Sequence, residues 1–441
     1  MMNSTKASIT HTTDIDKFAH DGRGIARIAG KTTFIEGALP QETVVFEYTR
    51  RKSDYDEGRV LEVLAPSPHR VTPPCPHYEL CGGCSLQHLA VDAQIQIKQT
   101  LLLDILQRIG HCQPLEILPS LVDTHHHYRN KARLSVRYVE KKSSTLIGFR
   151  EKKNPRYITD IQQCPVMHAK VDAHINEMRA LLDKIHAPRC IAQIEVAAGE
   201  DAVALILRHL TPLNDADKQL LEDFAKRTGF RIFLQPAGPD SVHLFYPLQS
   251  DEYLHYSLPE FDLTYRFHPT DFTQINAGIN RQMVSKAIQL LNLHSTDVVL
   301  DLFCGLGNFT LPIARHCAEV IGIEGSQTMI ERAAMNAKIN QIFNVEFACG
   351  NLEEWTFPKT MLHKVNKVLL DPPRSGALNI VKQMQQLQPA LIVYVSCNPV
   401  TLARDAEHLI TQGYVLHSAG VMDMFPHTSH VESMALFLKN K

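Results

Sequence analysis

Residues Val298–Ala314, VVLDLFCGLGNFTLPIA, decide the fold that we predict for this chain. The segment joins an apolar run, an acidic residue, a Gly-x-Gly turn and a helix start, as in the first strand–helix unit of a doubly wound sheet. Helical patterns separate this run from four later apolar runs. These are VIGIE (320–324), VEFACG (345–350), KVLLD (367–371) and LIVYVS (391–396). The alternation predicts a Rossmann-like parallel sheet over residues 266–441.

The glycine turn predicts a nucleoside cofactor, and two kinds compete. A dinucleotide fold favours a third glycine where this chain has Thr310, so that fit is poor. An acid before the loop, Asp301, suits the cationic amino acid end of S-adenosylmethionine. Glu324 at the next strand end suits the ribose hydroxyls, and Asn351 at the third suits adenine. We therefore predict a methyltransferase sheet.

The stretch VYVSCNP, Val393–Pro399, brings a cysteine to the end of a strand. Cys397 is either a small core residue or a nucleophile, since ligands bind at the carboxyl ends of such strands. Methylating C5 of a pyrimidine needs a thiolate that adds at C6, and a base that removes the C5 proton. Amine methylation needs no thiol, and Arg374 stands where that chemistry favours an aromatic residue after Asp371-Pro-Pro. Glu432, before the last apolar run, is a candidate base.

Composition places the chain among globular proteins. Its 441 residues allow two to four domains, and it has 44% hydrophobic residues and a net charge of −2. Ten cysteines with no apolar leader in MMNSTKASITHTTD predict reduced thiols and a cytoplasmic location without membrane spans. Ten Lys or Arg but only two acids lie between Arg129 and Arg156. Such a run is a solvated face or a phosphate-binding surface.

Three domains are expected. Short alternating runs with glycine turns predict a small OB-like β-barrel over residues 1–66. A mixed α+β domain follows over residues 67–265, with helices at Ala93–Arg108 and Ala169–Ile185 and strands at Arg133–Val139 and Ala202–Leu207. The Rossmann-like sheet completes the chain.

Four cysteines of the middle region suit a tetrathiolate metal site. Their pattern is C-x5-C-x2-C followed by a distant fourth, at Cys75, Cys81, Cys84 and Cys164. Zinc competes, but structural zinc sites usually pair two C-x2-C elements, so the lopsided spacing favours an iron–sulfur cluster. Radical methylthiolation, which needs C-x3-C-x2-C, does not fit.

Six motifs resemble, in order, those of the RNA uracil-C5 methyltransferases. They are DFTQIN (271–276), DLFCGLGNFTLPIA (301–314), IGIEG (321–325), LLDPPRSG (369–376), YVSCNPVTLARD (394–405) and HVESMALF (430–437). The resemblance implies Cys397 as nucleophile, Glu432 as base and Phe272 as the residue that stacks on the target base. It implies cofactor contacts from Gln274, Phe303, Asn308, Glu324, Asn351 and Asp371.

The upstream regions resemble the branch of this family that methylates uracil 1939 of 23S ribosomal RNA. That branch carries an RNA-binding TRAM barrel, which GRGIARIAGKTTFIEGALPQE (22–42) resembles, and a [4Fe-4S] cluster on the four-cysteine pattern. The resemblance implies a monomer that acts on 23S ribosomal RNA, with no membrane and no obligate protein partner. Another ribosomal or transfer RNA uridine, or a non-catalytic RNA-binding iron–sulfur protein, remains the alternative. The run His125–His127 is expected to form a surface turn.

Overall fold

The computed structural model describes residues 10–362 and 364–440, and the chain divides into two compact units. The first holds the residues up to Tyr78 together with Cys84–Leu101 and Phe425–His430. The second holds Glu79–Gly83, Leu102–Met424 and the residues from Val431 onward. The expected division into three domains stays a prediction. Residues 1–9, where we expected no leader peptide, lie outside the described part.

The first unit is built on a six-stranded sheet of order β1-β5-β6-β4-β3-β2. Buried and exposed residues alternate along its longer strands, so one face of the sheet encloses an apolar core. Ile35, Val44 and Phe46 are fully buried in that core. The strands are β1 (Thr10–Asp14), β2 (Lys17–Phe18), β3 (Gly24–Ile28), β4 (Lys31–Glu36), β5 (Thr43–Arg51) and β6 (Tyr55–Ala65). The region predicted to form a small β-barrel is therefore built of strands, and its closure into a barrel stays a prediction.

A buried ion pair fastens this sheet to the segment that follows it. The Glu42 side chain is fully buried, and its Oε2 accepts hydrogen bonds from Leu39 N and Arg70 Nη2, both at 2.8 Å. Arg70 Nη2 also donates to Gly37 O at 2.6 Å. Burial opposes ionisation of the Glu42 carboxyl, but the hydrogen bonds from Arg70, Leu39 and Ser67 outweigh it and lower the pKa.

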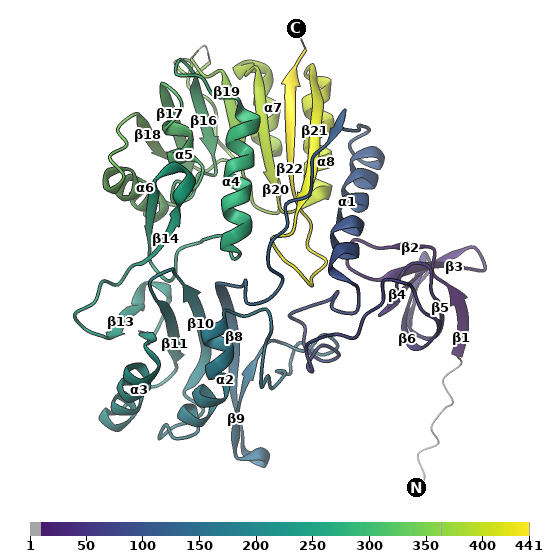
Figure 1. The fold of residues 1–441 in the computed structure, drawn as a ribbon, viewed down its shortest axis with the longest axis vertical. Coiled ribbons are helices and arrows are strands. Elements are labelled where there is room, and N and C mark those ends of the chain that lie inside the picture. The colour runs from purple at the N-terminus through teal and green to yellow at the C-terminus, as the bar shows by residue number, and fades with distance from the viewer. Residues whose placement is uncertain (1–9, 363, 441) are drawn as a thin grey trace. The chain divides into compact units, whose positions relative to one another are not determined.

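The second unit contains a central sheet of order β13-β12-β11-β10-β8-β9. Helices α2 (Ala169–Leu182) and α3 (Asp215–Thr228) cover one face of it (Figure 1). Their apolar sides, including Ile175 and Phe224, are buried, whereas Arg133, Arg137 and Arg208 are exposed. The strands are β8 (Lys131–Val139), β9 (Ser144–Gly148), β10 (Ile191–Ala198), β11 (Val203–His209), β12 (Arg231–Gln235) and β13 (His243–Tyr246).

The same unit contains an eight-stranded sheet of order β18-β17-β16-β19-β20-β22-β21-β7. Strands β16 to β20 run parallel, and β22 enters antiparallel between β20 and β21. The strands are β7 (Glu116–Ile117), β16 (Val298–Leu302), β17 (Glu319–Glu324), β18 (Val345–Cys349), β19 (Lys367–Leu370), β20 (Leu391–Ser396), β21 (Tyr414–Met422) and β22 (Glu432–Lys439). The Rossmann-like sheet predicted from Val298–Ala314 is confirmed.

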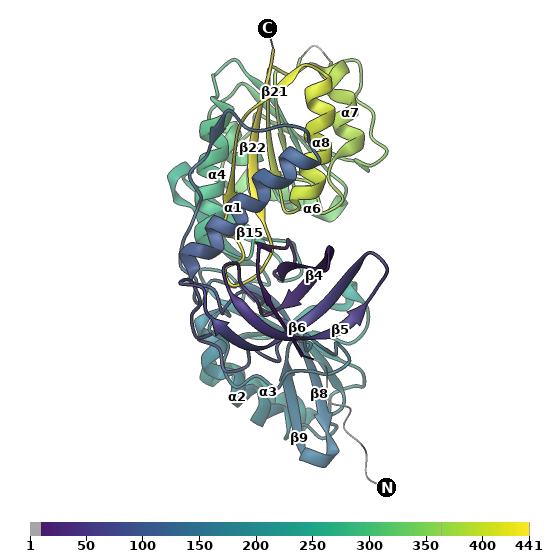
Figure 2. The ribbon, with the colours of Figure 1, turned by 90° about the vertical axis from the view of Figure 1, so that its right-hand side faces the viewer.

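Helices cover both faces of this sheet, with α4 on one side and α7 and α8 on the other (Figure 2). The helices are α4 (Ala277–Leu291), α5 (Thr310–Ala314), α6 (Gln327–Ile339), α7 (Leu378–Leu387) and α8 (Pro399–Thr411). Helix α1 (Val91–Arg108) precedes the sheet in the chain, near its predicted bounds. No helix in the described residues combines the length and apolarity that crossing a bilayer requires.

A short hairpin lies in the chain between the two sheets of the second unit (Figure 1). It consists of β14 (Leu254–Leu258) and β15 (Leu263–Phe267), which pair only with each other. Sequence patterns did not indicate it. The run His125–His127 forms a bend with His126 and His127 exposed, so the expected surface turn is confirmed.

Replacing Arg70 with Ala should expose the strand amides of the first unit to exchange. The variant leaves the Glu42 carboxylate buried without its cation, which costs about 3 kcal/mol or more. Hydrogen–deuterium exchange of the β4 and β5 amides measures the loss. The control Arg51→Ala removes an exposed arginine 3.8 Å from Asp56 and should cost less than about 1 kcal/mol. Equal exchange in both variants would contradict the assignment.

Candidate functional site

The predicted site residues of the large sheet meet at one edge because parallel strands end on the same side. Strand β16 is followed by the glycine loop, β19 by Asp371 and β20 by Cys397. Glu324 ends β17, and Asn351 follows β18. Strand β22 runs in the opposite direction, so it begins where the others end. Ser433 pairs with Ser396, which sets Glu432 beside Cys397.

The turn that carries Cys397 is fixed on both sides by hydrogen bonds. Ser396 Oγ donates to Asn398 O at 3.0 Å, and Asn398 Nδ2 donates to Arg374 O at 3.0 Å. Asn398 also caps α8, because its Oδ1 accepts from Val400 N at 3.1 Å. Pro399 fits the first turn of a helix, where no backbone donor is needed. The strand therefore ends on a rigid turn, and the Cys397 side chain is half-buried.

The charges around Cys397 favour its neutral thiol. Burial, together with the carboxylates of Glu432 and Asp371, raises the pKa of the thiol to about 11, against the guanidinium of Arg374. Burial also raises the pKa of Asp371 to about 7. At neutral pH the site therefore holds a protonated thiol beside carboxyl groups, one of which changes charge near neutrality.

The glycine loop adopts backbone conformations that residues other than glycine rarely adopt. Gly305 and Gly307 have φ of +55° and +93°, and Phe303 has φ of +64°. The N–H groups of Phe303 and Cys304 donate to Ile323 O at 2.9 and 3.2 Å. Glu324 accepts from Gly305 N at 3.2 Å and from Ser326 N at 3.0 Å. The carboxylate expected at the ribose thus also holds the loop.

Asp301 differs from our expectation. Its side chain is fully buried rather than turned to a ligand, and its Oδ2 accepts from Thr310 Oγ1 at 2.5 Å. Within the described residues, Oδ1 has no hydrogen-bond partner, and burial raises the pKa of the carboxyl to about 7. Thr310 occupies the position of the third glycine in dinucleotide folds, and its hydroxyl explains why a glycine would not serve here. Asp301 therefore stabilises the glycine loop through its hydrogen bond with Thr310.

The segment with Phe272 and Gln274 is anchored while Phe272 itself is exposed. Asp271 is buried, and its Oδ2 accepts from His268 N at 2.7 Å and from Arg332 Nε at 2.8 Å. Lys131 donates to the carbonyl of Asp271. The Phe272 side chain is 68% exposed. An exposed aromatic ring on an anchored turn is suited to stacking on a planar ligand.

Two residues near the glycine loop were missed by the sequence analysis. Asn308, an expected cofactor contact, exchanges hydrogen bonds with Asn280 of α4 and accepts one from the Tyr256 hydroxyl of the hairpin. Neither partner lies near the loop in sequence. The one feature of the sequence that could have indicated Asn280 is a polar residue on the buried side of a helix.

The four cysteines expected to bind a metal are mostly buried. Cys75, Cys81 and Cys164 have 7–8% exposure, and Cys84 is half-buried. In the first unit, Cys75 N donates to Gln87 Oε1 at 3.1 Å. In the second, Gly83 N donates to Cys81 Sγ at 3.4 Å. Across residues 10–362 and 364–440, no three His, Cys, Asp or Glu side chains are grouped to hold a metal ion.

Comparison with known proteins points to one family. The family model described as tRNA (uracil-5-)-methyltransferase matches residues 90–441. The 23S rRNA (uracil(1939)-C(5))-methyltransferase of Legionella pneumophila strain Paris is 56% identical, with 98% of this chain and 97% of that protein aligned. The protein of the same description from Hahella chejuensis is 49% identical, with 97% of each chain aligned.

A solved structure agrees over nearly the whole chain. It is the crystal structure of the Pyrococcus abyssi tRNA (uracil-54, C5)-methyltransferase in complex with S-adenosyl-L-homocysteine. The TM-score is 0.74 at 26% identity, with 97% of this chain and 100% of that one covered.

Replacing Glu432 with Gln should lower the pKa of Cys397, because the carboxylate favours the neutral thiol. The rate of Cys397 alkylation by iodoacetamide, followed by peptide mass spectrometry from pH 7 to 11, measures the shift. In the wild-type protein the rate should still rise above pH 9, and in Glu432→Gln the curve should move to lower pH. The exposed Cys349 is the internal reference. Superimposable Cys397 curves would contradict the assignment.

Proposed function

The chain belongs to the tRNA (uracil-5-)-methyltransferase family, and we propose that it transfers a methyl group from S-adenosylmethionine to C5 of uridine 1939 in 23S ribosomal RNA. The identity of 56% to a methyltransferase of that description supports the substrate. The main structural support for the chemistry is the pairing of Ser396 with Ser433. This pairing supports a reaction in which the Cys397 thiol and the Glu432 carboxylate act on the same base. The alternatives are another ribosomal or transfer RNA uridine, or RNA binding without catalysis.

In this proposal Cys397 makes C5 of uracil nucleophilic. The thiol loses its proton, and Sγ bonds to C6, so the electron pair of the C5–C6 double bond becomes available at C5. S-adenosylmethionine, when bound, would supply an electrophilic methyl group to C5, and the methyl–sulfur bond would break to leave S-adenosylhomocysteine. Glu432 then takes the proton from C5, the double bond re-forms, and Sγ leaves C6. Bonds and charges balance without an oxidant.

The charges of the site set a condition on the first step. A thiol with a pKa near 11 is almost entirely protonated at neutral pH. Cys397 ionises more readily when a positive charge lies nearby. Arg374 provides one such charge, and a cationic methyl donor would provide a second. This arrangement favours attack by Cys397 only after the donor is bound, which protects the RNA from unproductive addition.

The proposed cofactor contacts fit a nucleoside ligand. Glycines at positive φ let backbone approach a ligand closely, and the loop between β16 and α5 has two of them. Glu324 is half-buried at the end of β17, a suitable position for ribose hydroxyls. We propose contacts from Gln274, Phe303, Asn308, Glu324, Asn351 and Asp371.

Several features support an RNA substrate. C6 of a stacked uracil is hidden, so the target base must be unpaired or turned out of the stack. The exposed ring of Phe272 would stack on it. Arg133 and Arg137 are exposed on β8, where the intervening Leu134 and Val136 are buried, and would contact phosphates. We further propose that the six-stranded sheet of the first unit is a TRAM domain, and that the protein acts in the cytoplasm as a monomer.

We also propose that Cys75, Cys81, Cys84 and Cys164 bind a [4Fe-4S] cluster. Four thiols form the donor set of such clusters, and low exposure of three of them suits ligands shielded from water. The proposed role is structural, with no part in methyl transfer.

Two variants should separate the roles of the thiol and the carboxylate. The wild-type protein should form 5-methyluridine at position 1939 in an unmodified 23S RNA fragment, mapped by mass spectrometry of nuclease fragments. Cys397→Ala should lower the rate by more than about 10³-fold while RNA and cofactor binding persist, because covalent activation is lost. Glu432→Gln should methylate once and then remain bonded to the RNA, since the C5 proton stays.

A denaturing gel distinguishes the two variants, with no adduct for Cys397→Ala and a persistent adduct for Glu432→Gln. Cys349→Ala, which replaces an exposed cysteine, is the matched control and should turn over normally. Methylation by Cys397→Ala would refute the covalent mechanism. If the wild-type protein methylates transfer RNA in preference to the 23S RNA fragment, the substrate is a transfer RNA uridine instead.

Protein purified without oxygen should be brown and contain about four irons and four acid-labile sulfides per chain. Iron and sulfide assays with metal analysis measure this. Replacing Cys164 with Ser should lower the iron content, whereas Cys317→Ser should not. Colourless protein with stoichiometric zinc would contradict the iron–sulfur proposal.

A further inference from the structure

The β14–β15 hairpin carries two stacked tyrosines whose hydroxyls reach the glycine loop. Tyr256 and Tyr265 are paired across the strands, with ring centroids 4.7 Å apart and an interplanar angle of 2°. Tyr265 is fully buried, and its hydroxyl donates to Gly307 O at 3.3 Å. The Tyr256 hydroxyl donates to Asn308 Oδ1 at 3.0 Å. One element outside the Rossmann-like sheet therefore contacts both the backbone and a side chain of the loop.

The Asn308 amide is almost fully occupied by these neighbours. Its Oδ1 accepts from Tyr256 and, at 3.1 Å, from Asn280 Nδ2. Its Nδ2 donates to Asn280 Oδ1 at 2.9 Å. An amide oxygen accepts two hydrogen bonds and an NH2 group donates two. A single N–H is thus left for a ligand, and a donor in this position matches an acceptor oxygen of the cofactor, such as its carboxylate.

The Tyr256 hydroxyl favours one of the two orientations of the Asn308 amide. The Asn280–Asn308 pair alone is nearly symmetric, because both amides can turn over together and exchange the same two hydrogen bonds. A turned pair would present an oxygen to the ligand instead of an N–H. In the turned pair the Tyr256 hydroxyl would accept from the Asn308 NH2 group, and the phenol proton would lose the acceptor that Oδ1 provides at 3.0 Å. The phenol therefore favours the first orientation, in which an N–H faces the ligand.

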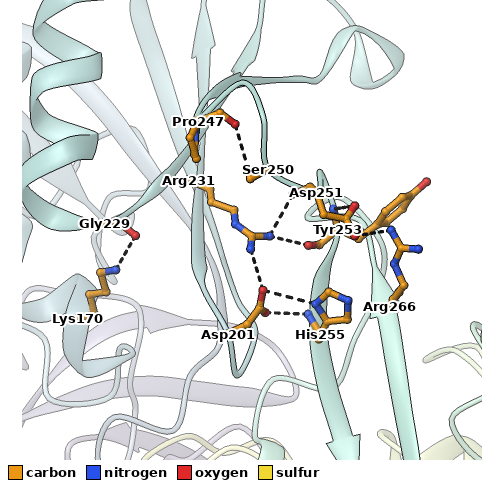
Figure 3. A network of polar contacts seen from close by, with 10 residues as sticks. All are labelled: Lys170, Asp201, Gly229, Arg231, Pro247, Ser250, Asp251, Tyr253, His255 and Arg266. Carbon is orange, nitrogen blue, oxygen red and sulfur yellow. Dashed lines mark hydrogen bonds and ion pairs between the residues drawn. The ribbon is translucent and has the colours of Figure 1, made fainter.

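The hairpin that carries Tyr256 is itself fastened to the central sheet (Figure 3). Arg231, at the start of β12, donates through Nη1 to Tyr253 O at 2.6 Å and to Asp251 O at 3.2 Å. Its Nη2 lies 2.8 Å from Asp201 Oδ2, and Asp201 Oδ1 accepts from His255 N at 3.0 Å. The backbone on both sides of Leu254 is therefore held, which fixes the base of β14.

A second carboxylate holds the other end of β14. Glu200 Oε1 accepts from Ser257 N at 3.1 Å, and its Oε2 accepts from Ser257 Oγ at 2.8 Å. Residues on either side of Tyr256 are thus bonded to the turn between β10 and β11. Tyr256 is held in place before any ligand binds, so the Asn308 amide is oriented in advance.

We propose that Tyr256 is a positioning residue for S-adenosylmethionine, which it serves by orienting the Asn308 amide. The inference rests on the proposed function, in which Asn308 contacts the cofactor, and extends it to a residue outside the motif series. In this proposal Tyr256 acts on cofactor affinity through Asn308 and takes no part in RNA binding or in methyl transfer. Its removal therefore changes the KM for the cofactor and not the kcat.

Tyr256→Phe tests the proposal because it removes only the hydroxyl and keeps the stacked ring. The dissociation constant for S-adenosylhomocysteine, measured by calorimetry without RNA, should rise about fivefold to tenfold, the effect of one hydrogen bond. The KM for S-adenosylmethionine should rise by a similar factor, with kcat at saturating cofactor and the KM for RNA within about twofold of the wild type. Tyr414→Phe, which removes a buried hydroxyl that donates to Pro389 O at 2.8 Å, should leave the affinity unchanged.

A double variant decides whether Tyr256 acts through Asn308. In an Asn308→Ala background, Tyr256→Phe should weaken cofactor binding no further. Three results would each overturn the proposal. They are wild-type cofactor affinity in Tyr256→Phe, a further loss of affinity in the double variant beyond that of Asn308→Ala, and an equal loss of affinity in Tyr414→Phe. If the wild-type protein fails to bind S-adenosylhomocysteine, the proposed function fails first, and this result is distinct from the other three.

Discussion

The site depends on one antiparallel strand among parallel ones. Strands β16 to β20 bring their carboxyl ends to a single edge of the sheet, where loops of the same direction gather. Strand β22 begins at that edge, so a residue near the end of the chain lies beside one that ends β20. Cys397 and Glu432 are 35 positions apart in sequence, yet the register makes them neighbours. A one-residue slip of β22 would turn Glu432 to the opposite face of the sheet.

Gathering acids at this edge has an electrostatic cost that shapes the proposed reaction. Burial raises the pKa of Asp301 and Asp371 to about 7 each, and burial with nearby carboxylates raises that of Cys397 to about 11. A site with this balance attracts a cation, since a positive charge relieves the repulsion among the carboxylates. S-adenosylmethionine is cationic at the sulfonium and at its amino group. The charges that keep the thiol protonated at neutral pH would therefore also favour a cationic ligand.

The strands of the large sheet, two helices of the middle region and the residues at the strand ends could be predicted from sequence. Their signals are local, because an apolar run, a glycine turn and a polar residue at a strand end lie within a few positions. Asp301 was misread for the same reason, since sequence gives a residue's position but not the direction of its side chain. The hydroxyl of Thr310, nine residues away, turns the carboxylate inward. The metal site and the domain boundaries remain predictions.

The hairpin escaped prediction for a different reason. Tyr256 lies 52 residues before Asn308, and neither the tyrosine nor the strand around it has a pattern that indicates a cofactor site. The position of Tyr256 is set only in the folded protein, because the turn between β10 and β11 fixes the backbone on either side of this residue. A loop with two glycines at positive φ can adopt many backbone conformations. Contacts from other elements must therefore fix the conformation that it takes. The stacked tyrosines contact both Gly307 and Asn308 of that loop from an element far away in sequence, so the loop motif alone does not reveal the groups that orient it.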